Sequence, residues 1–178
     1  MPRILVVLDY YLPGYKAGGP IRTIANMVER LGDEFEFYII TSDRDVGECH
    51  PYPGIKVGSW QSVGKAHVLY LPPSKMSFFA WYRLLKGFQY DLIYLNSFFS
   101  RLSIKTVMLR WMQLLPKKPV VLAPRGEFSL GALSLKSLKK HLYISLAKYL
   151  GLYSGVIWQV SSEYEMEDIL SVFGTKAT

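Results

Sequence analysis

Cysteine, histidine and long uncharged apolar runs are all scarce in this sequence of 178 residues. The single cysteine, Cys49, excludes an intramolecular disulfide and is typical of a reducing compartment. The three histidines are far apart and lack ligand spacing, so neither a metal nor another cofactor is predicted. No uncharged apolar stretch approaches the roughly 18 to 20 residues that a membrane span needs. We therefore expect a cytoplasmic protein, with contact to the inner face of the membrane left open.

Positive charge is concentrated in one part of the chain. The net charge is +7, and residues 101–150 carry ten basic side chains against one acidic, whereas residues 1–50 and 151–178 are net acidic. A local excess of this kind predicts a local anionic partner. No known nucleic-acid reader motif accompanies it, so nucleic acid is not an expected partner.

Apolar runs of strand length alternate with helical patterns along the chain. The expected strands are 3–9, 35–41, 67–71, 91–95, 119–124 and 156–161, with a weaker one near 55–60. The expected helices are 20–32, 76–88, 100–115, 134–151 and 163–172. Several strands are apolar on both faces, which predicts helices on both sides of them. The alternation predicts an α/β fold: a Rossmann-like open, mostly parallel sheet formed by residues 1–178 as one domain.

A long loop, residues 10–19, follows the first expected strand and ends in Gly18 and Gly19. Ligands of open α/β sheets bind beyond the carboxyl ends of the strands, where this loop lies. Glycines allow a ligand to approach the backbone closely, and Pro20 suits the first position of the following helix. The sequence lacks the G-x-G-x-x-G of a dinucleotide site. A flexible turn before a helix is the simpler alternative.

The start of that helix is a predicted anion site. The free amides of Ile21 and Arg22 would point at a ligand above the helix, as helix N-termini do toward phosphate. The side chains of Arg22 and Lys16 add positive charge nearby.

Polar residues also follow three later strands. Arg125 and Glu127 suggest a site arginine held by a neighbouring acid, or else a structural ion pair at a strand end. Asn96 occupies the equivalent edge one strand earlier, where a plain turn is the alternative. Asp43, in the segment DRD, is expected in a solvated loop, with contact to a ligand's hydroxyl groups as the other possibility.

Four segments, in order, resemble the N-terminal half of retaining glycosyltransferases of family four, which have the two-domain GT-B architecture. They are YKAGGPIRTIANMVERL, YIITSDRDVGE, VLAPRGEFSLGALSLKSLKK and VSSEYE. The resemblance implies that this domain holds a saccharide or lipid-linked acceptor. A second domain, expected beyond residue 178, would hold a nucleotide-diphosphate sugar. Reaction in the cleft between them usually needs no metal.

The resemblance also implies roles for individual residues. Gly18 and Gly19, with Arg22, would face the diphosphate of the donor, and Lys16, Asp43 and Glu127 would contact the acceptor. Many relatives carry a histidine after the fifth or sixth strand, where this chain has Asn96 and Arg125, so those two become the expected catalytic residues. The family's pair of glutamates belongs to the second domain. The alternative is a non-catalytic module that binds a phosphorylated ligand or an anionic membrane.

The expected helix 134–151 is amphipathic. Its apolar stripe comprises Leu135, Leu138, Leu142, Leu146 and Tyr149, and its lysines, Lys136, Lys139, Lys140 and Lys148, fall largely off that stripe. One interpretation packs the leucines on the sheet and leaves the lysines in water. The other uses the lysines to dock on an anionic membrane or a phosphorylated lipid acceptor.

Overall fold

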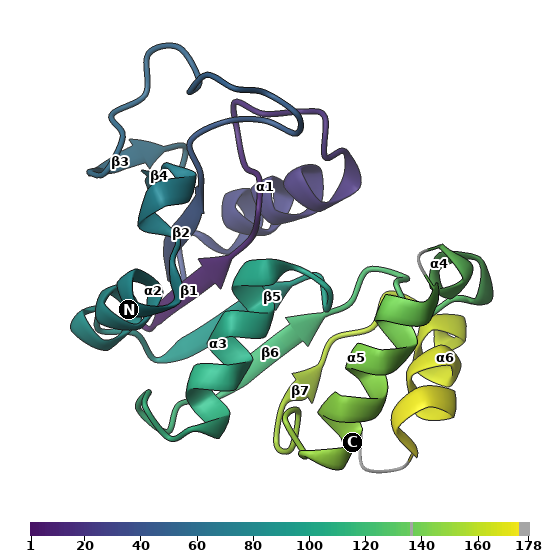
Figure 1. Ribbon diagram of the computed structural model, residues 1–178. Coiled ribbons are helices and arrows are strands. Elements are labelled where there is room, and N and C mark those ends of the chain that lie inside the picture. Colours follow the sequence, from purple (N-terminus) through teal and green to yellow (C-terminus); the bar gives the residue numbers. More distant parts are fainter. Residues whose placement is uncertain (136, 175–178) are drawn as a thin grey trace.

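The computed structural model describes residues 1–135 and 137–174, which form a seven-stranded sheet covered by helices (Figure 1). The strands are β1 (Arg3–Val7), β2 (Glu36–Ser42), β3 (Trp60–Val63), β4 (Ala66–Leu71), β5 (Leu92–Asn96), β6 (Val120–Ala123) and β7 (Ile157–Trp158). The helices are α1 (Gly19–Leu31), α2 (Phe78–Gly87), α3 (Arg101–Trp111), α4 (Leu130–Ser134), α5 (Ser137–Tyr149) and α6 (Glu163–Phe173), with a short 3-10 helix at Pro73–Lys75.

The strand order is β3-β4-β2-β1-β5-β6-β7, and only the β3–β4 pair is antiparallel in the described part of the chain. The expectation of an open, mostly parallel α/β sheet is therefore confirmed. The chain leaves β1 toward β2 on one side and later returns to place β5 on the other. Such a reversal opens a crevice at the carboxyl ends of β1 and β5, the usual ligand position in this architecture.

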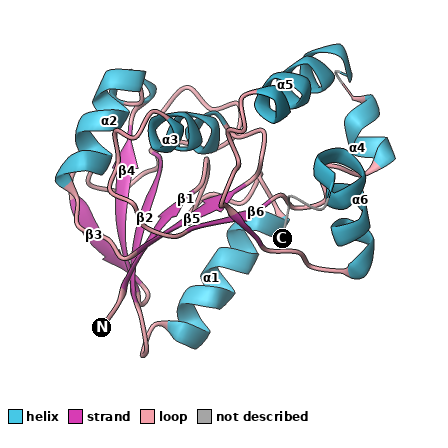
Figure 2. Cartoon of the chain, turned by 90° about the horizontal axis from the view of Figure 1, so that it is seen from below, coloured by secondary structure: helices cyan, strands magenta, loops and turns pink. Residues whose placement is uncertain are grey.

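Helices cover both faces of the sheet (Figure 2). On one face α1 buries Ile21, Ile24 and Val28. On the other, α2 packs on α3, and the Nε1 of the fully buried Trp81 donates to Thr106 Oγ1 at 2.9 Å. Burial on two faces explains why the central strands are apolar at nearly every position.

Three expected elements differ from the structure. The weak strand near 55–60 lies later in the chain, because β3 forms a hairpin with β4 through Gly64, whose φ of +57° suits glycine. The strand expected at 156–161 is reduced to β7, which pairs only with β6. The helix expected at 134–151 begins later, as α5, because Ser134 belongs to the separate short helix α4, which Leu135 ends with an extended backbone (φ −74°, ψ 121°). Within residues 1–135 and 137–174, no helix combines the length and apolar character needed to cross a bilayer.

Candidate functional site at the carboxyl edge of the sheet

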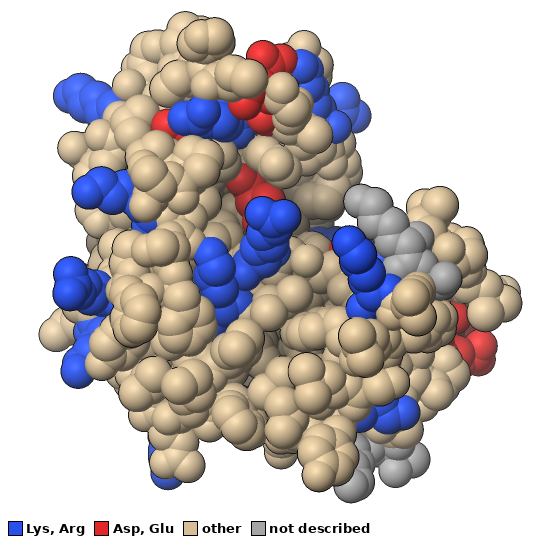
Figure 3. Space-filling model, in the orientation of Figure 1, with Lys and Arg blue, Asp and Glu red and all other residues tan. Residues whose placement is uncertain are grey.

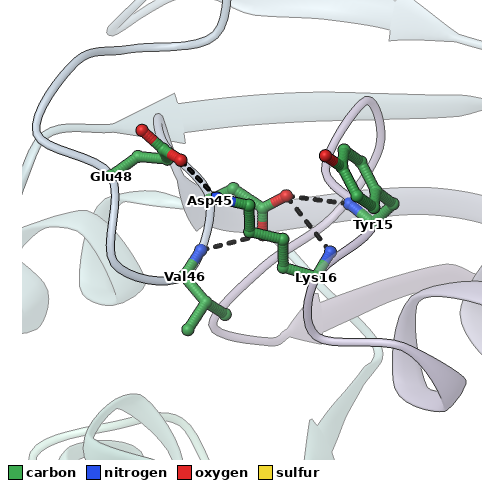
Figure 4. A network of polar contacts seen from close by, with 5 residues as sticks. All are labelled: Tyr15, Lys16, Asp45, Val46 and Glu48. Atoms are coloured by element: carbon green, nitrogen blue, oxygen red, sulfur yellow. Dashed lines mark hydrogen bonds and ion pairs between the residues drawn. The ribbon is translucent and has the colours of Figure 1, made fainter.

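The loop between β1 and α1 is held in place by one buried carboxylate (Figure 4). Asp45 Oδ2 accepts hydrogen bonds from the amides of Tyr15 at 2.9 Å and Lys16 at 3.2 Å, and Oδ1 accepts from the Val46 amide at 2.8 Å. Burial opposes ionisation of Asp45, but these backbone hydrogen bonds outweigh it and lower the pKa of the carboxyl. The glycine-rich loop is thus tied to the loop after β2.

The two glycines of this loop have different structural requirements. Gly18 has φ 68° and ψ −126°, a region that side chains disfavour, and its amide donates to Tyr15 O at 3.0 Å. The Gly18 amide is therefore already paired within the loop and is not free to bind an anion. Gly19 has no left-handed φ, and a Cβ built on it would meet no atom within 4 Å. The fold itself does not require glycine at position 19.

The start of α1 has unpaired amides. Among the described residues, the amides of Gly19 and Ile21 donate no hydrogen bond, and no side chain caps the helix. Helix N-termini with free amides favour anions. Arg22 is exposed next to them. Anion binding at this helix start, including the predicted role of the Arg22 amide, stays a prediction.

Lys16 and Asp43 are both engaged with neighbours. The Lys16 ammonium forms an ion pair with Glu48 (Figure 4), and that hydrogen bond raises the pKa of Lys16. Asp43 is buried, and its Oδ1 accepts from Arg44 Nε at 2.7 Å. The expectation that residues 43–45 form a solvated loop is wrong, because Asp43 and Asp45 are both buried and Asp45 bonds the loop before α1. Contact of Lys16 or Asp43 with an acceptor stays a prediction.

Arg125 and Asn96 lie in direct contact, at the ends of β6 and β5. Arg125 Nε donates to Asn96 Oδ1 at 2.6 Å, and Nη2 donates to Tyr94 Oη at 3.0 Å. Arg125 has a φ of 59° and Ser97 a φ of 79°, which are unusual for residues other than glycine. Such strained residues cluster at functional sites.

Glu127 does not hold Arg125, contrary to expectation. Its Oε1 accepts from Ser97 Oγ at 2.6 Å, and its Oε2 accepts from the amides of Phe98 and, at 3.3 Å, Phe99. Burial raises the pKa of Glu127 despite these hydrogen bonds. Glu127 therefore braces the turn from β5 into α3, and its predicted contact with an acceptor is untested.

A second glutamate, Glu165, braces the loop after β6. Its Oε1 accepts from the Gly126 amide at 2.6 Å, and its Oε2 accepts from the amide and hydroxyl of Ser161, both at 2.7 Å. Sequence reasoning assigned no site role to Glu165. The signal was present in the pattern S-x-x-E at the start of α6, because Ser162 Oγ accepts from the Glu165 amide at 3.2 Å.

A cavity of about 530 Å³ opens at the crevice between β1 and β5. Asp9, just after β1, lines it beside Ser100, whose Oγ donates to Asp9 Oδ1 at 2.9 Å. Burial raises the pKa of the Asp9 carboxyl, although Ser100 and Arg101 oppose the shift. We did not predict Asp9 as a site residue, yet its place directly after the apolar run 4–8 was a usable signal.

One polar network joins the ends of three strands. Ser100 bonds Asp9 through Oγ, and its amide donates to Ser97 Oγ at 3.1 Å. Ser97 in turn donates to Glu127. The network connects the loops after β1, β5 and β6. In residues 1–135 and 137–174, no group of three or more His, Cys, Asp or Glu side chains is arranged to hold a metal ion.

The raised pKa of Asp9 predicts a pH-dependent gain in stability for Asp9→Asn. A carboxyl whose folded pKa lies above its ordinary value of 3.8 reduces stability as it ionises on rising pH. The variant should therefore be more stable than wild type near pH 7, and the two should converge below about pH 4, where the acid is neutral. Urea unfolding of both proteins across this pH range measures the difference in stability. A wild-type protein more stable than the variant at pH 7 would contradict the expectation.

Helix α5 turns its leucine stripe outward, away from the sheet. Its stripe is in water, with exposed fractions of 81% for Leu138, 70% for Leu142 and 87% for Tyr149. Lys140 donates to Ala132 O at 2.6 Å, and Lys148 donates to Val172 O. The helix packs inward through other residues instead, namely Ile144 and Ala147.

Of the remaining lysines in this predicted patch, Lys139 is exposed and Lys136 lies outside the described residues. The expectation that the leucines cover the sheet is wrong. Figure 3, in the orientation of Figure 1, shows mostly uncharged side chains over α5, with a few basic groups among them.

Comparisons with protein families and with curated proteins gave no match. No known family model matches the chain. No curated protein matches it significantly either.

Proposed function

We propose that this chain is the acceptor-side domain of a retaining GT-B glycosyltransferase. The complete enzyme would move a sugar from a nucleotide-diphosphate sugar to a hydroxyl of a saccharide or lipid-linked acceptor, in synthesis of cell-surface polysaccharide or glycolipid. Support comes from the resemblance of four ordered segments and from the fold. The observation that carries it is the clamped loop before α1, which leaves the Gly19 and Ile21 amides without partners.

In the proposed reaction the loop would act on the leaving group. The acceptor hydroxyl oxygen bonds to the anomeric carbon of the donor, and the bond from that carbon to the diphosphate oxygen breaks. The hydroxyl proton passes to the departing diphosphate, which leaves as the nucleoside diphosphate. Amides held in place before reaction stabilise the negative charge that develops there, without the cost of reorienting water.

Arg125 would act at the same edge of the sheet. An arginine has five N–H donors, and two of those in Arg125 are engaged by Asn96 and Tyr94. The remaining donors suit a phosphate or carboxylate of donor or acceptor. Asn96, buried behind the guanidinium, would position it rather than contact substrate.

A transfer assay tests the proposal. The protein, as its gene encodes it, is incubated with a panel of nucleotide-diphosphate sugars and hydroxyl acceptors, and products are identified by mass spectrometry. NMR of the new anomeric centre reports its configuration. Product with the donor's configuration supports the proposal; inversion, or no product with any donor, refutes it.

A second candidate function is docking on an anionic membrane, which the outward stripe of α5 favours. Leu138 and Leu142 are exposed, and Lys139 lies beside them on the helix. Trp111 is 47% exposed and continues this surface, because its Nε1 donates to Leu150 O at the end of α5. Apolar ridges with tryptophan and lysine beside them are typical of helices that lie in a bilayer interface. The net charge of +7 suits anionic lipid.

This surface predicts the effect of Leu142→Glu on membrane binding. Burying one leucine contributes about 1.5–3 kcal/mol, so a charge there should weaken binding at least about tenfold. Sedimentation with phosphatidylcholine vesicles, with and without phosphatidylglycerol, measures it. Phe79→Glu on α2 is the matched control, since Phe79 is 76% exposed away from α5. Wild type should prefer the anionic vesicles; absent or equal binding removes this function.

A further inference from the structure

The cavity beside Asp9 carries two positive side chains from one helix. Arg101 and Lys105 both line it and are one turn apart on α3, so they lie on the same face. Lys105 Nζ donates to Met76 O, which anchors the ammonium at the wall. Among the described residues, the exposed Arg101 guanidinium makes no hydrogen bond or ion pair with another side chain or backbone group. Figure 3 shows acidic and basic groups side by side in a hollow of this face.

The remaining wall is suited to a sugar ring. Tyr10 and Phe99, both half-buried, line the same cavity and offer aromatic surface. Asp9 Oδ1 accepts from Ser100, whereas Oδ2 has no donor among the described residues. Since ligand pockets commonly measure about 300–1,000 Å³, this cavity can hold one or two sugar units.

We infer that the cavity binds the acceptor as an anionic saccharide. Arg101 and Lys105 hold its carboxylate or phosphate group, and Asp9 Oδ2 accepts a hydrogen bond from one of its hydroxyls. Two cations with unused donors, facing a single carboxylate, select a negatively charged ligand over a neutral one. The inference rests on the proposed function and extends it by naming the class of acceptor.

Calorimetric titration of the chain with three probes tests this inference. The probes are methyl glucuronide, glucose 1-phosphate and the neutral methyl glucoside, so the two sources of anionic charge are separated. At least one anionic probe should bind at least tenfold more tightly than the glucoside, and its affinity should fall with added salt. Equal affinities, or no binding of either anionic probe, would overturn the inference.

Variants assign the binding to the two cations. Arg101→Gln and Lys105→Gln should each weaken binding of the anionic probe about tenfold, whereas Lys105→Arg, which keeps the charge, should retain most of it. Arg83→Gln is the control, because Arg83 is exposed on α2 and outside the cavity. Unchanged affinity in both glutamine variants, with folding verified by circular dichroism, would place the anion elsewhere and refute the inference.

The titration and the transfer assay test different claims, so either claim can be refuted without the other. Anion binding without transfer to any acceptor refutes the glycosyltransferase and leaves an anion site. Transfer to neutral acceptors, with no preference for anionic ones, refutes only the inference about acceptor class.

Discussion

Replacing Gly19 with valine should lower the proposed sugar transfer at least about 100-fold while leaving the fold intact. A Cβ at this position meets no atom of the protein within 4 Å, so the side chain would project into open space beside the free amides. That space is where the donor diphosphate is proposed to lie. Loss of one preorganised donor, or a displacement of about 1 Å, commonly costs a factor of 10² or more.

The measurement pairs transfer rates with thermal unfolding. Gly87→Val is the matched control, because Gly87 also has open space around it and no left-handed φ, but lies at the end of α2 away from the loop. Both variants should unfold within a few degrees of wild type, and only Gly19→Val should lose transfer. Wild-type transfer in Gly19→Val would remove the loop from the reaction.

Arg125→Gly should lower transfer about 100-fold with only modest destabilisation. The substitution removes the guanidinium, and glycine tolerates the φ of 59° that strains the native residue. Relief of that strain, about 1 kcal/mol, partly offsets the stability lost with the hydrogen bonds to Asn96 and Tyr94, each of which contributes about 1 kcal/mol. A net loss of about 1–2 kcal/mol leaves a typical domain folded.

Arg125→Lys separates charge from geometry. Lysine keeps the positive charge but lacks the planar fork, so it cannot bond Asn96 and a ligand oxygen in the same way. We expect an intermediate loss of transfer, about tenfold, with urea unfolding as the check on stability. If Arg125→Gly transfers sugar as well as wild type, the arginine has only a structural role.

The central sheet could be predicted because its signal is local. Runs such as 3–9 and 91–95 are mostly apolar, as expected where both faces are buried; β1 lies within the first, and β5 overlaps the second and ends one residue later, at Asn96. The strands at the two edges of the sheet were harder to predict. Trp60–Val63 forms a strand only because the Gly64 turn folds it back on β4, and β7 is short because it pairs on one side only. Edge strands depend on partners that a single segment does not reveal.

The sequence predicted where the candidate site residues lie along the strands, but not which residues they contact. Strand ends correctly placed Asn96 and Arg125 at one edge of the sheet, since the carboxyl ends of parallel strands share it, but their direct contact was not predicted. They did not reveal that Glu127 turns toward Ser97, or that Asp45 holds the loop before α1. These contacts join residues about thirty positions apart, and acids near an arginine in sequence are not thereby its neighbours in space.

Helix α5 separates what the sequence alone determines from what the tertiary structure decides. The recurrence of leucine at helical spacing determines that Leu138, Leu142 and Leu146 share a face, because that follows from 3.6 residues per turn. Which face meets the protein depends on the neighbouring elements. The break after α4 and the packing of Ile144 and Ala147 direct the leucines outward. Periodicity thus specifies a stripe, and only the packing of distant segments specifies its partner.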